Sequence, residues 1–309
     1  MGKSGERVRQ LKRKRPGYGE ILDFYSKVRE LQDRSKLSLK TDPIKLEKER
    51  KDLLAGECFS LIRKEDFPLD IEASIRLFRS LCRIGKAANP HMAGQVEKIR
   101  EVLGNKKMDL KKLFDGGVKE EKIRQAAVES GLDETIFSFF IQSSIRPSIE
   151  AGVEQLRGEL DPETWRKGHC PACSSLPSLS LLKGEEGRRY LLCSFCGYQW
   201  RTDRLSCPAC NNKDRESLEY FCGEGEEAFR IDLCDRCHRY IKTIDYRNLE
   251  ESDPCLEDLA TLHLDILASN KGYKRPDGVG QDLKSALLGI PGRSIAAGGW
   301  AAEPAEKKK

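Results

Sequence analysis

Eight of the twelve cysteines in this 309-residue chain form four Cys-x-x-Cys pairs. Four thiolates from two such pairs can hold one metal ion in a tetrahedral site. Nineteen residues separate the first pair from the second, and twenty-three separate the third from the fourth, which is close to the usual spacing within one such site. The sequence therefore predicts two metal sites. The first comprises Cys170, Cys173, Cys193 and Cys196, and the second comprises Cys207, Cys210, Cys234 and Cys237.

The residues between the paired cysteines repeat as well. "LPSLSLLKGEEGRRYLLC" and "SLEYFCGEGEEAFRIDLC" both have the pattern of a strand, a glycine-containing turn and a second strand. "GYQWRTDRL" and "HRYIKTIDY" then follow as matching third strands. The pattern predicts two copies of one unit of roughly forty residues. A hairpin alone is marginally stable in water, so a metal–thiolate cluster at its base would supply the missing stability.

The sequence leaves the metal open between iron and zinc, since both accept four thiolates. Iron knuckles of the rubredoxin type favour a following glycine, which adopts the left-handed conformation easily. Gly197 fits this pattern, whereas Ser174, Asn211 and His238 do not. A thiol–disulfide redox centre is disfavoured, because such motifs normally occur once, at the start of a helix.

Helical patterns flank the cysteine-rich region. Apolar residues recur at helical spacing between residues 17 and 168, where Pro147 is expected to break or kink the last helix. Asp253 and Pro254 then begin a C-terminal helix within 251–276. The expected fold is α+β: an all-α N-terminal domain (17–168), two tandem rubredoxin-like or zinc-ribbon units (169–206 and 207–250), and the C-terminal helix. Residues 1–16, a basic segment, and 277–309 are predicted to be disordered tails.

Composition and missing motifs narrow the function. No apolar run is long enough to cross a membrane, and no secretory signal is visible, so the expected location is the cytoplasm. Eight thiolates and two divalent ions would reduce the net charge of +5 to about +1. The sequence has no Walker loop, GxGxxG, HExxH or GxSxG motif. We therefore expect a protein that is not an enzyme.

Two alternatives remain open at this point. A nucleic-acid-binding zinc ribbon could use Arg188, Arg189, Arg201 and Arg204 with the interleaved Tyr190, Tyr198 and Trp200. Nucleic acid is nevertheless an unlikely partner, because no wider basic stripe accompanies these residues. A rubredoxin-like electron carrier is the other alternative, although the large helical half argues for a protein client instead.

The order of these parts resembles the formate dehydrogenase accessory protein family, FdhE. The resemblance rests on "CPAC", "LLCSFCGYQW", "LCDRCHRYIKTID" and the helix "DLATLHLDILASNKGYKR". It implies a cytoplasmic chaperone-like maturation factor that binds the formate dehydrogenase catalytic subunit. It also implies two metal ions per chain at the eight paired cysteines, with iron associated with such motifs. Redox sensing is compatible with this chemistry, and the client would bind a helical face or the groove between the two metal units.

Overall fold

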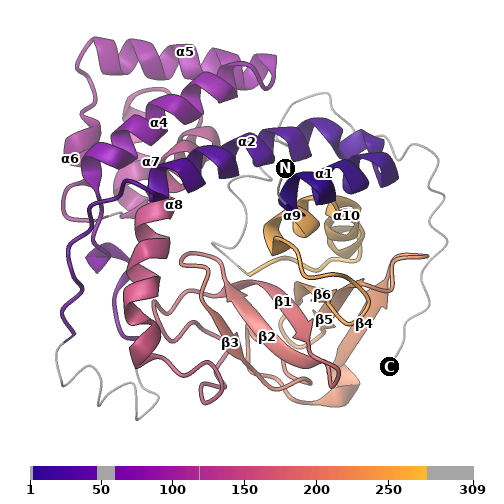
Figure 1. Ribbon diagram of the computed structural model, residues 1–309. Coiled ribbons are helices and arrows are strands. Elements are labelled where there is room, and N and C mark those ends of the chain that lie inside the picture. The colour runs from indigo at the N-terminus through magenta and orange to yellow at the C-terminus, as the bar shows by residue number, and fades with distance from the viewer. Residues whose placement is uncertain (1–2, 47–59, 118, 277–309) are drawn as a thin grey trace.

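Figure 1 shows a computed structural model that describes residues 3–46, 60–117 and 119–276. Residues 47–59 and 118 of the helical domain predicted over 17–168 and all of the tail predicted over 277–309 lie outside these residues. The described part confirms the α+β fold class: a helical N-terminal region precedes a sheet that carries two four-cysteine clusters and two C-terminal helices. No helix in these ranges is both long and apolar enough to span a bilayer.

Short polar caps define where the helices of the N-terminal half begin. The side chains of Asp70, Asn89 and Asp133 accept backbone N–H groups three residues on and start α4, α5 and α8, which satisfies amides that the first helical turn leaves unpaired. The helices of this half are α2 (Gly19–Lys36), α4 (Ile71–Lys86), α5 (Pro90–Gly104), α6 (Leu110–Phe114), α7 (Glu120–Glu129) and α8 (Glu134–Leu156).

Helix α8 lies at the centre of this half, and the break expected at Pro147 does not occur. The helix continues through Pro147 to Leu156. A proline lacks the N–H that would bond the carbonyl four residues earlier, here that of Ser143. Gln32 of α2, which is buried, instead donates its Nε2–H to Ser143 O at 2.9 Å. A tertiary contact therefore satisfies the carbonyl that the proline leaves free.

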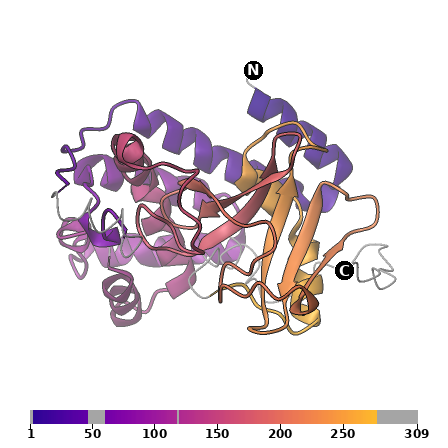
Figure 2. The same cartoon turned by 90° about the horizontal axis from the view of Figure 1, so that it is seen from below.

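The two cysteine units join into one six-stranded sheet. The first unit contributes β1 (Pro177–Lys183), β2 (Arg188–Cys193) and β3 (Gln199–Arg201), and the second contributes β4 (Leu218–Cys222), β5 (Phe229–Cys234) and β6 (Arg239–Asp245). The spatial order is β3-β2-β1-β6-β5-β4, and only the pairing of β1 with β6, which joins the units, is parallel. Figure 2 shows the helical half beside this sheet.

The disordered tail predicted for residues 1–16 is wrong over its described part, because Lys3–Lys14 form helix α1. Arg7 pairs with Glu257 at 2.6 Å, and Arg15 pairs with Glu226 and donates to Ala260 O. Val8 and Leu11 pack against Leu256 and Leu259 of the C-terminal helices. The basic residues thus fix α1 to the other end of the described chain, as Figure 1 shows.

The single helix predicted within 251–276 is two helices, α9 (Pro254–Leu259) and α10 (Leu262–Asn270). Lys242 of β6, whose side chain is 0% exposed, points into the junction between them. Its ammonium donates to Asp258 O, Thr261 O and Asp265 Oδ2 at 2.7–3.0 Å. Arg275 pairs with both Asp258 and Asp265. This buried network fastens α9 and α10 to the sheet.

The Lys242→Met substitution is expected to lower the free energy of unfolding by about 3 kcal/mol, since removing one partner of a buried ion pair leaves uncompensated charge. Urea denaturation followed by circular dichroism would measure it. Lys107→Met, at an exposed loop position, is the control and should change stability by less than about 0.5 kcal/mol. Equal effects of the two substitutions would contradict the role of the network.

Candidate metal centres

The first four predicted ligands converge at the base of the β1–β2 hairpin. The Sγ atoms of Cys170 and Cys196 are 3.6 Å apart, those of Cys173 and Cys193 are 3.5 Å apart, and all four lie within 4.8 Å of one another. A tetrahedral site with metal–sulfur bonds of about 2.3 Å places its sulfur atoms about 3.8 Å apart. The cysteines are free thiols, and their arrangement fits one zinc or iron ion.

The second set converges in the same way at the base of the β4–β5 hairpin. The Cys207–Cys237 and Cys210–Cys234 sulfur pairs are each 3.7 Å apart, and the four ligand atoms again lie within 4.8 Å of one another. The structure therefore brings together both predicted groups of four, in the predicted pairing, and each could hold a metal ion.

All four cysteine knuckles share one backbone turn. The residue after each second cysteine has φ between 52° and 73°, and its N–H donates to the carbonyl of the first cysteine at 2.8–3.3 Å. Glycine occupies this position only at Gly197; elsewhere it is Ser174, Asn211 or His238. The left-handed turn is therefore present even where the residue type argues against it, because the cysteine geometry requires it. Residue type at this position does not separate iron from zinc here.

The first cluster is built into the core of the helical half. All four of its cysteines are buried, and they belong to the same apolar cluster as Phe78, Phe137 and Phe140. The N–H groups of Leu61 and Ile62 donate to Pro171 O and Ala172 O at 3.0 Å, so the first knuckle carries a short backbone ladder.

The second knuckle of this cluster also touches the helical half. The Phe195 ring packs edge-on against Phe67, and Arg146 of α8 donates to Phe195 O at 3.3 Å. Two independent sets of contacts therefore tie the first cluster to the N-terminal half. Burial raises the pKa of the Cys170 thiol, so a metal ion must displace a proton there to bind.

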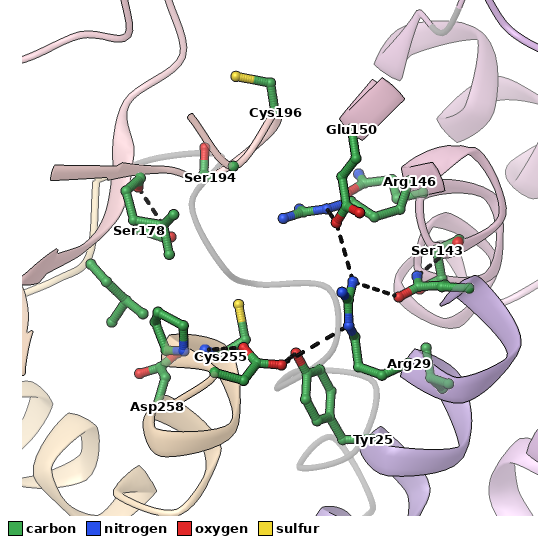
Figure 3. A pocket seen from close by; sticks show the side chains of 18 of the residues that line it. Tyr25, Arg29, Ser143, Arg146, Glu150, Ser178, Ser194, Cys196, Cys255 and Asp258 are labelled. Carbon is green, nitrogen blue, oxygen red and sulfur yellow. Dashed lines mark hydrogen bonds and ion pairs between the residues drawn. The ribbon is translucent and has the colours of Figure 1, made fainter. Parts of the chain in front are cut away.

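A cavity of about 440 Å³ is lined by this knuckle and by residues of α2, α8 and α9 (Figure 3). Arg29 lines it, 3.1 Å from Glu150 and 4.0 Å from Asp253, and the Tyr25 hydroxyl donates to Asp253. The Cys255 thiol faces this space, and burial raises its pKa to about 11, so it stays protonated at neutral pH. The charges are mutually paired, and we regard this cavity as the seam that couples the helical half to α9.

The second cluster is more exposed than the first. Cys210 and Cys237 are half-buried, whereas Cys207 and Cys234 are buried. The Asn212 side chain points its N–H toward Cys234 Sγ at 3.7 Å. The two clusters thus share ligands and turn geometry but differ in access to solvent.

Three of the four arginines considered for nucleic-acid binding are already engaged with carboxylates of the protein. Arg188 pairs with Glu186, Arg201 pairs with Glu163, and Arg189 is buried beside Asp232. Trp200 is fully buried, with its indole N–H donating to Lys167 O. These side chains do not form an exposed stacking platform, which counts against a nucleic-acid interface on the first unit.

Sequence reasoning missed the side chains that hold these units in place, namely Lys242, Arg146 and Gln32. Lys242 had one visible signal: a charged residue in the strand pattern "HRYIKTIDY", where a buried strand calls for apolar residues. Arg146 and Gln32 lie among many charged and polar helix residues, and nothing in their spacing distinguishes them.

The fold and site together define a helical protein that carries two tandem four-cysteine units in one sheet. The model of the FdhE central domain matches residues 169–204, and the model of the FdhE C-terminal domain matches residues 205–279. A relative named "Protein FdhE homolog" from Aquifex aeolicus (strain VF5) is 28% identical over 271 residues, which cover 86% of this chain and 90% of the relative. The chain is therefore similar to FdhE proteins, and residues 169–279 match the FdhE domain models.

Two further comparisons show the same similarity. A second "Protein FdhE homolog", from Haemophilus influenzae (strain PittEE), is 36% identical over 110 residues, or 35% of this chain and 36% of the relative. The crystal structure of the FdhE protein from Pseudomonas aeruginosa matches with a TM-score of 0.64, covering 88% of this chain and 91% of that chain at 23% identity. That match shows a shared fold.

We predict that a chelator removes metal from the second site first, because its ligands are partly exposed while the first cluster opens only with the core. Release should be biphasic, with the phases about tenfold or more apart, when followed by a chromogenic chelator. The double substitution Cys207→Ser/Cys210→Ser should abolish the fast phase and leave the slow one. A single phase, or loss of the slow phase in this variant, would contradict the assignment.

Ser174→Gly is expected to stabilise the metal-loaded protein by about 1 kcal/mol, since glycine relieves the left-handed strain at this exposed position. Ser174→Val should destabilise it, because a β-branched residue fits this region poorly. Thermal unfolding at matched metal content would measure both. If the two variants shift the melting temperature in the same direction, the strain is not what controls stability here.

Proposed function

We propose that this protein is a cytoplasmic accessory factor for the assembly of a formate dehydrogenase. In this role it binds the catalytic subunit of that enzyme during maturation and does not catalyse the enzyme's reaction itself. The similarity to FdhE proteins supports this proposal, together with the likeness of the motifs to formate dehydrogenase accessory proteins. A reducing compartment would keep the eight thiols available for metal.

The main observation behind the proposal is that the two clusters belong to one sheet but are unequally buried. If both metal ions only stabilised the fold, both clusters could be buried. Here the first cluster joins the helical core, whereas the second leaves Cys210 and Cys237 partly open to solvent. We assign the first metal to structure and the second to the surface that meets the client.

The second site can also respond to redox conditions if it holds iron. An iron–tetrathiolate centre exchanges one electron, with a potential tuned by hydrogen bonds and solvent exposure, whereas zinc has no redox chemistry. The contact of Asn212 with Cys234 and the partial exposure of this cluster are features that tune such a potential. Elemental analysis of anaerobically purified protein decides the metal, and zinc alone would rule out the redox role.

The proposal predicts that anaerobic affinity capture from the native lysate recovers a formate dehydrogenase catalytic subunit, identified by mass spectrometry. Cys207→Ser/Cys210→Ser should reduce the recovered subunit by about tenfold or more, because the client-facing unit loses its metal. Cys82→Ser, which changes a buried cysteine outside both clusters, is the matched control and should retain the client.

Two outcomes would contradict the proposal. Capture of ribosomal or RNA-processing proteins that nuclease treatment abolishes would indicate a nucleic-acid role. Electron transfer to a redox partner, without recovery of any formate dehydrogenase subunit, would favour a rubredoxin-like carrier.

A further inference from the structure

A second hollow, of about 390 Å³, lies in the groove between the two metal units. Cys207 and Cys234 of the second cluster form part of its wall, and strands β4 and β5 form another part. It lies apart from the seam cavity of Figure 3, whose lining residues are different. Five arginines but only two carboxylates line it: Arg189, Arg204, Arg215, Arg230 and Arg239, with Glu219 and Asp232.

Three of these arginines are committed to the protein's own structure. Arg239 donates to Arg275 O at 3.0 Å. Arg189 is buried and reaches Ser180 Oγ, Ser206 O and Asp232 at 2.8–3.3 Å. Arg230 lies 2.8 Å from Asp232 and stacks over the Tyr220 ring at 4.9 Å. Asp232 is therefore already neutralised, and it holds both guanidinium groups at the inner wall.

Arg204 and Arg215 differ from them. Both are exposed at the rim, and among the residues that the structure describes neither has a carboxylate within 4.0 Å. Arg204 donates only to Glu186 O, at 3.4 Å. Both rim guanidinium groups remain available to an anionic ligand.

The rest of the lining is largely apolar. Leu205, 51% exposed, stands at the rim, and Leu218, Pro208 and Pro276 continue the apolar surface. A large exposed leucine beside unpaired guanidinium groups fits a ligand that carries both carboxylates and an apolar group.

Strand β4 could also bind the backbone of a peptide ligand. It is the last strand of the sheet, so within the described residues its outer edge has no strand partner. An extended peptide can add to such an edge through main-chain hydrogen bonds, while pockets beside it select the side chains. Three of its residues, Leu218, Glu219 and Tyr220, also line the hollow. A peptide along β4 would therefore pass the rim arginines.

We propose that this hollow binds an extended acidic peptide segment of a partner protein, with Arg204 and Arg215 pairing with its carboxylates and Leu205 contacting an apolar side chain. This inference rests on the proposed function, for which it names the client-binding surface. Because the Cys207–Cys210 knuckle supplies one wall, metal in the second site is needed to hold the hollow in shape.

Fluorescence anisotropy tests this with the full-length, metal-loaded protein and a labelled peptide that alternates glutamate with leucine. Arg204→Ala/Arg215→Ala should weaken binding by about tenfold or more, since each carboxylate–guanidinium pair contributes to affinity. Arg79→Ala/Arg83→Ala removes the same charge from exposed positions on α4 and should leave binding unchanged. A second peptide carries glutamine in place of glutamate. The unaltered protein should bind this peptide as weakly as the Arg204→Ala/Arg215→Ala variant binds the acidic peptide.

Three results would overturn the inference. Equal losses in the rim and α4 variants would show that only net charge matters. Equal binding of the glutamine peptide would show that carboxylates are not recognised. Competition by inorganic phosphate at concentrations similar to those of the peptide would make the hollow a simple oxyanion site.

Affinity capture with the same rim variant separates this inference from the proposed function. If the variant retains the formate dehydrogenase subunit but loses the acidic peptide, the assembly function stands and the hollow is not the client surface. If the unaltered protein binds the peptide but captures no such subunit, the assembly function fails and the peptide site stands.

Discussion

The burial of four thiol groups in the helical core is the constraint on which the rest of the structure depends. Cys170, Cys173, Cys193 and Cys196 are packed among aromatic side chains of the first half, where unpaired thiolates would be strongly unfavourable. A divalent ion neutralises half of their charge and fixes the two knuckles at once. Those knuckles in turn receive Leu61, Ile62 and Arg146 from the helical half. Without a metal ion in the first site, the two knuckles that form the centre of the interface between the two halves would not be held in place.

The second unit has the same local geometry as the first but different surroundings. Its knuckles repeat the left-handed turn and the sulfur spacing of the first, but no comparable helical domain covers them within the described chain. The unit is held instead through strand pairing and through Lys242, which joins β6 to α9 and α10. One copy of the repeated unit is thus protected and the other is accessible, and the accessible copy borders the arginine-lined hollow.

The sequence was most informative where chemistry fixes spacing. Paired cysteines define both clusters because a metal site requires four ligands at set distances, and the glycine turns define the hairpins. Tertiary contacts explain what was missed. The continuation of α8 past Pro147 depends on Gln32, α1 depends on ion pairs with residues far along the chain, and the merging of the two units depends on a parallel pairing of β1 with β6. None of these leaves a local pattern.

The pairing of β1 with β6 also affects how the chain can fold during synthesis. β1 leaves the ribosome well before its parallel partner, and contacts between residues distant in sequence form slowly. During that interval one edge of β1 has no neighbour, and an unpaired edge is a template for aggregation. Helix α1 must likewise wait for α9, whose Glu257 receives Arg7. The nascent chain is therefore most vulnerable between the emergence of Lys183 and that of Asp245.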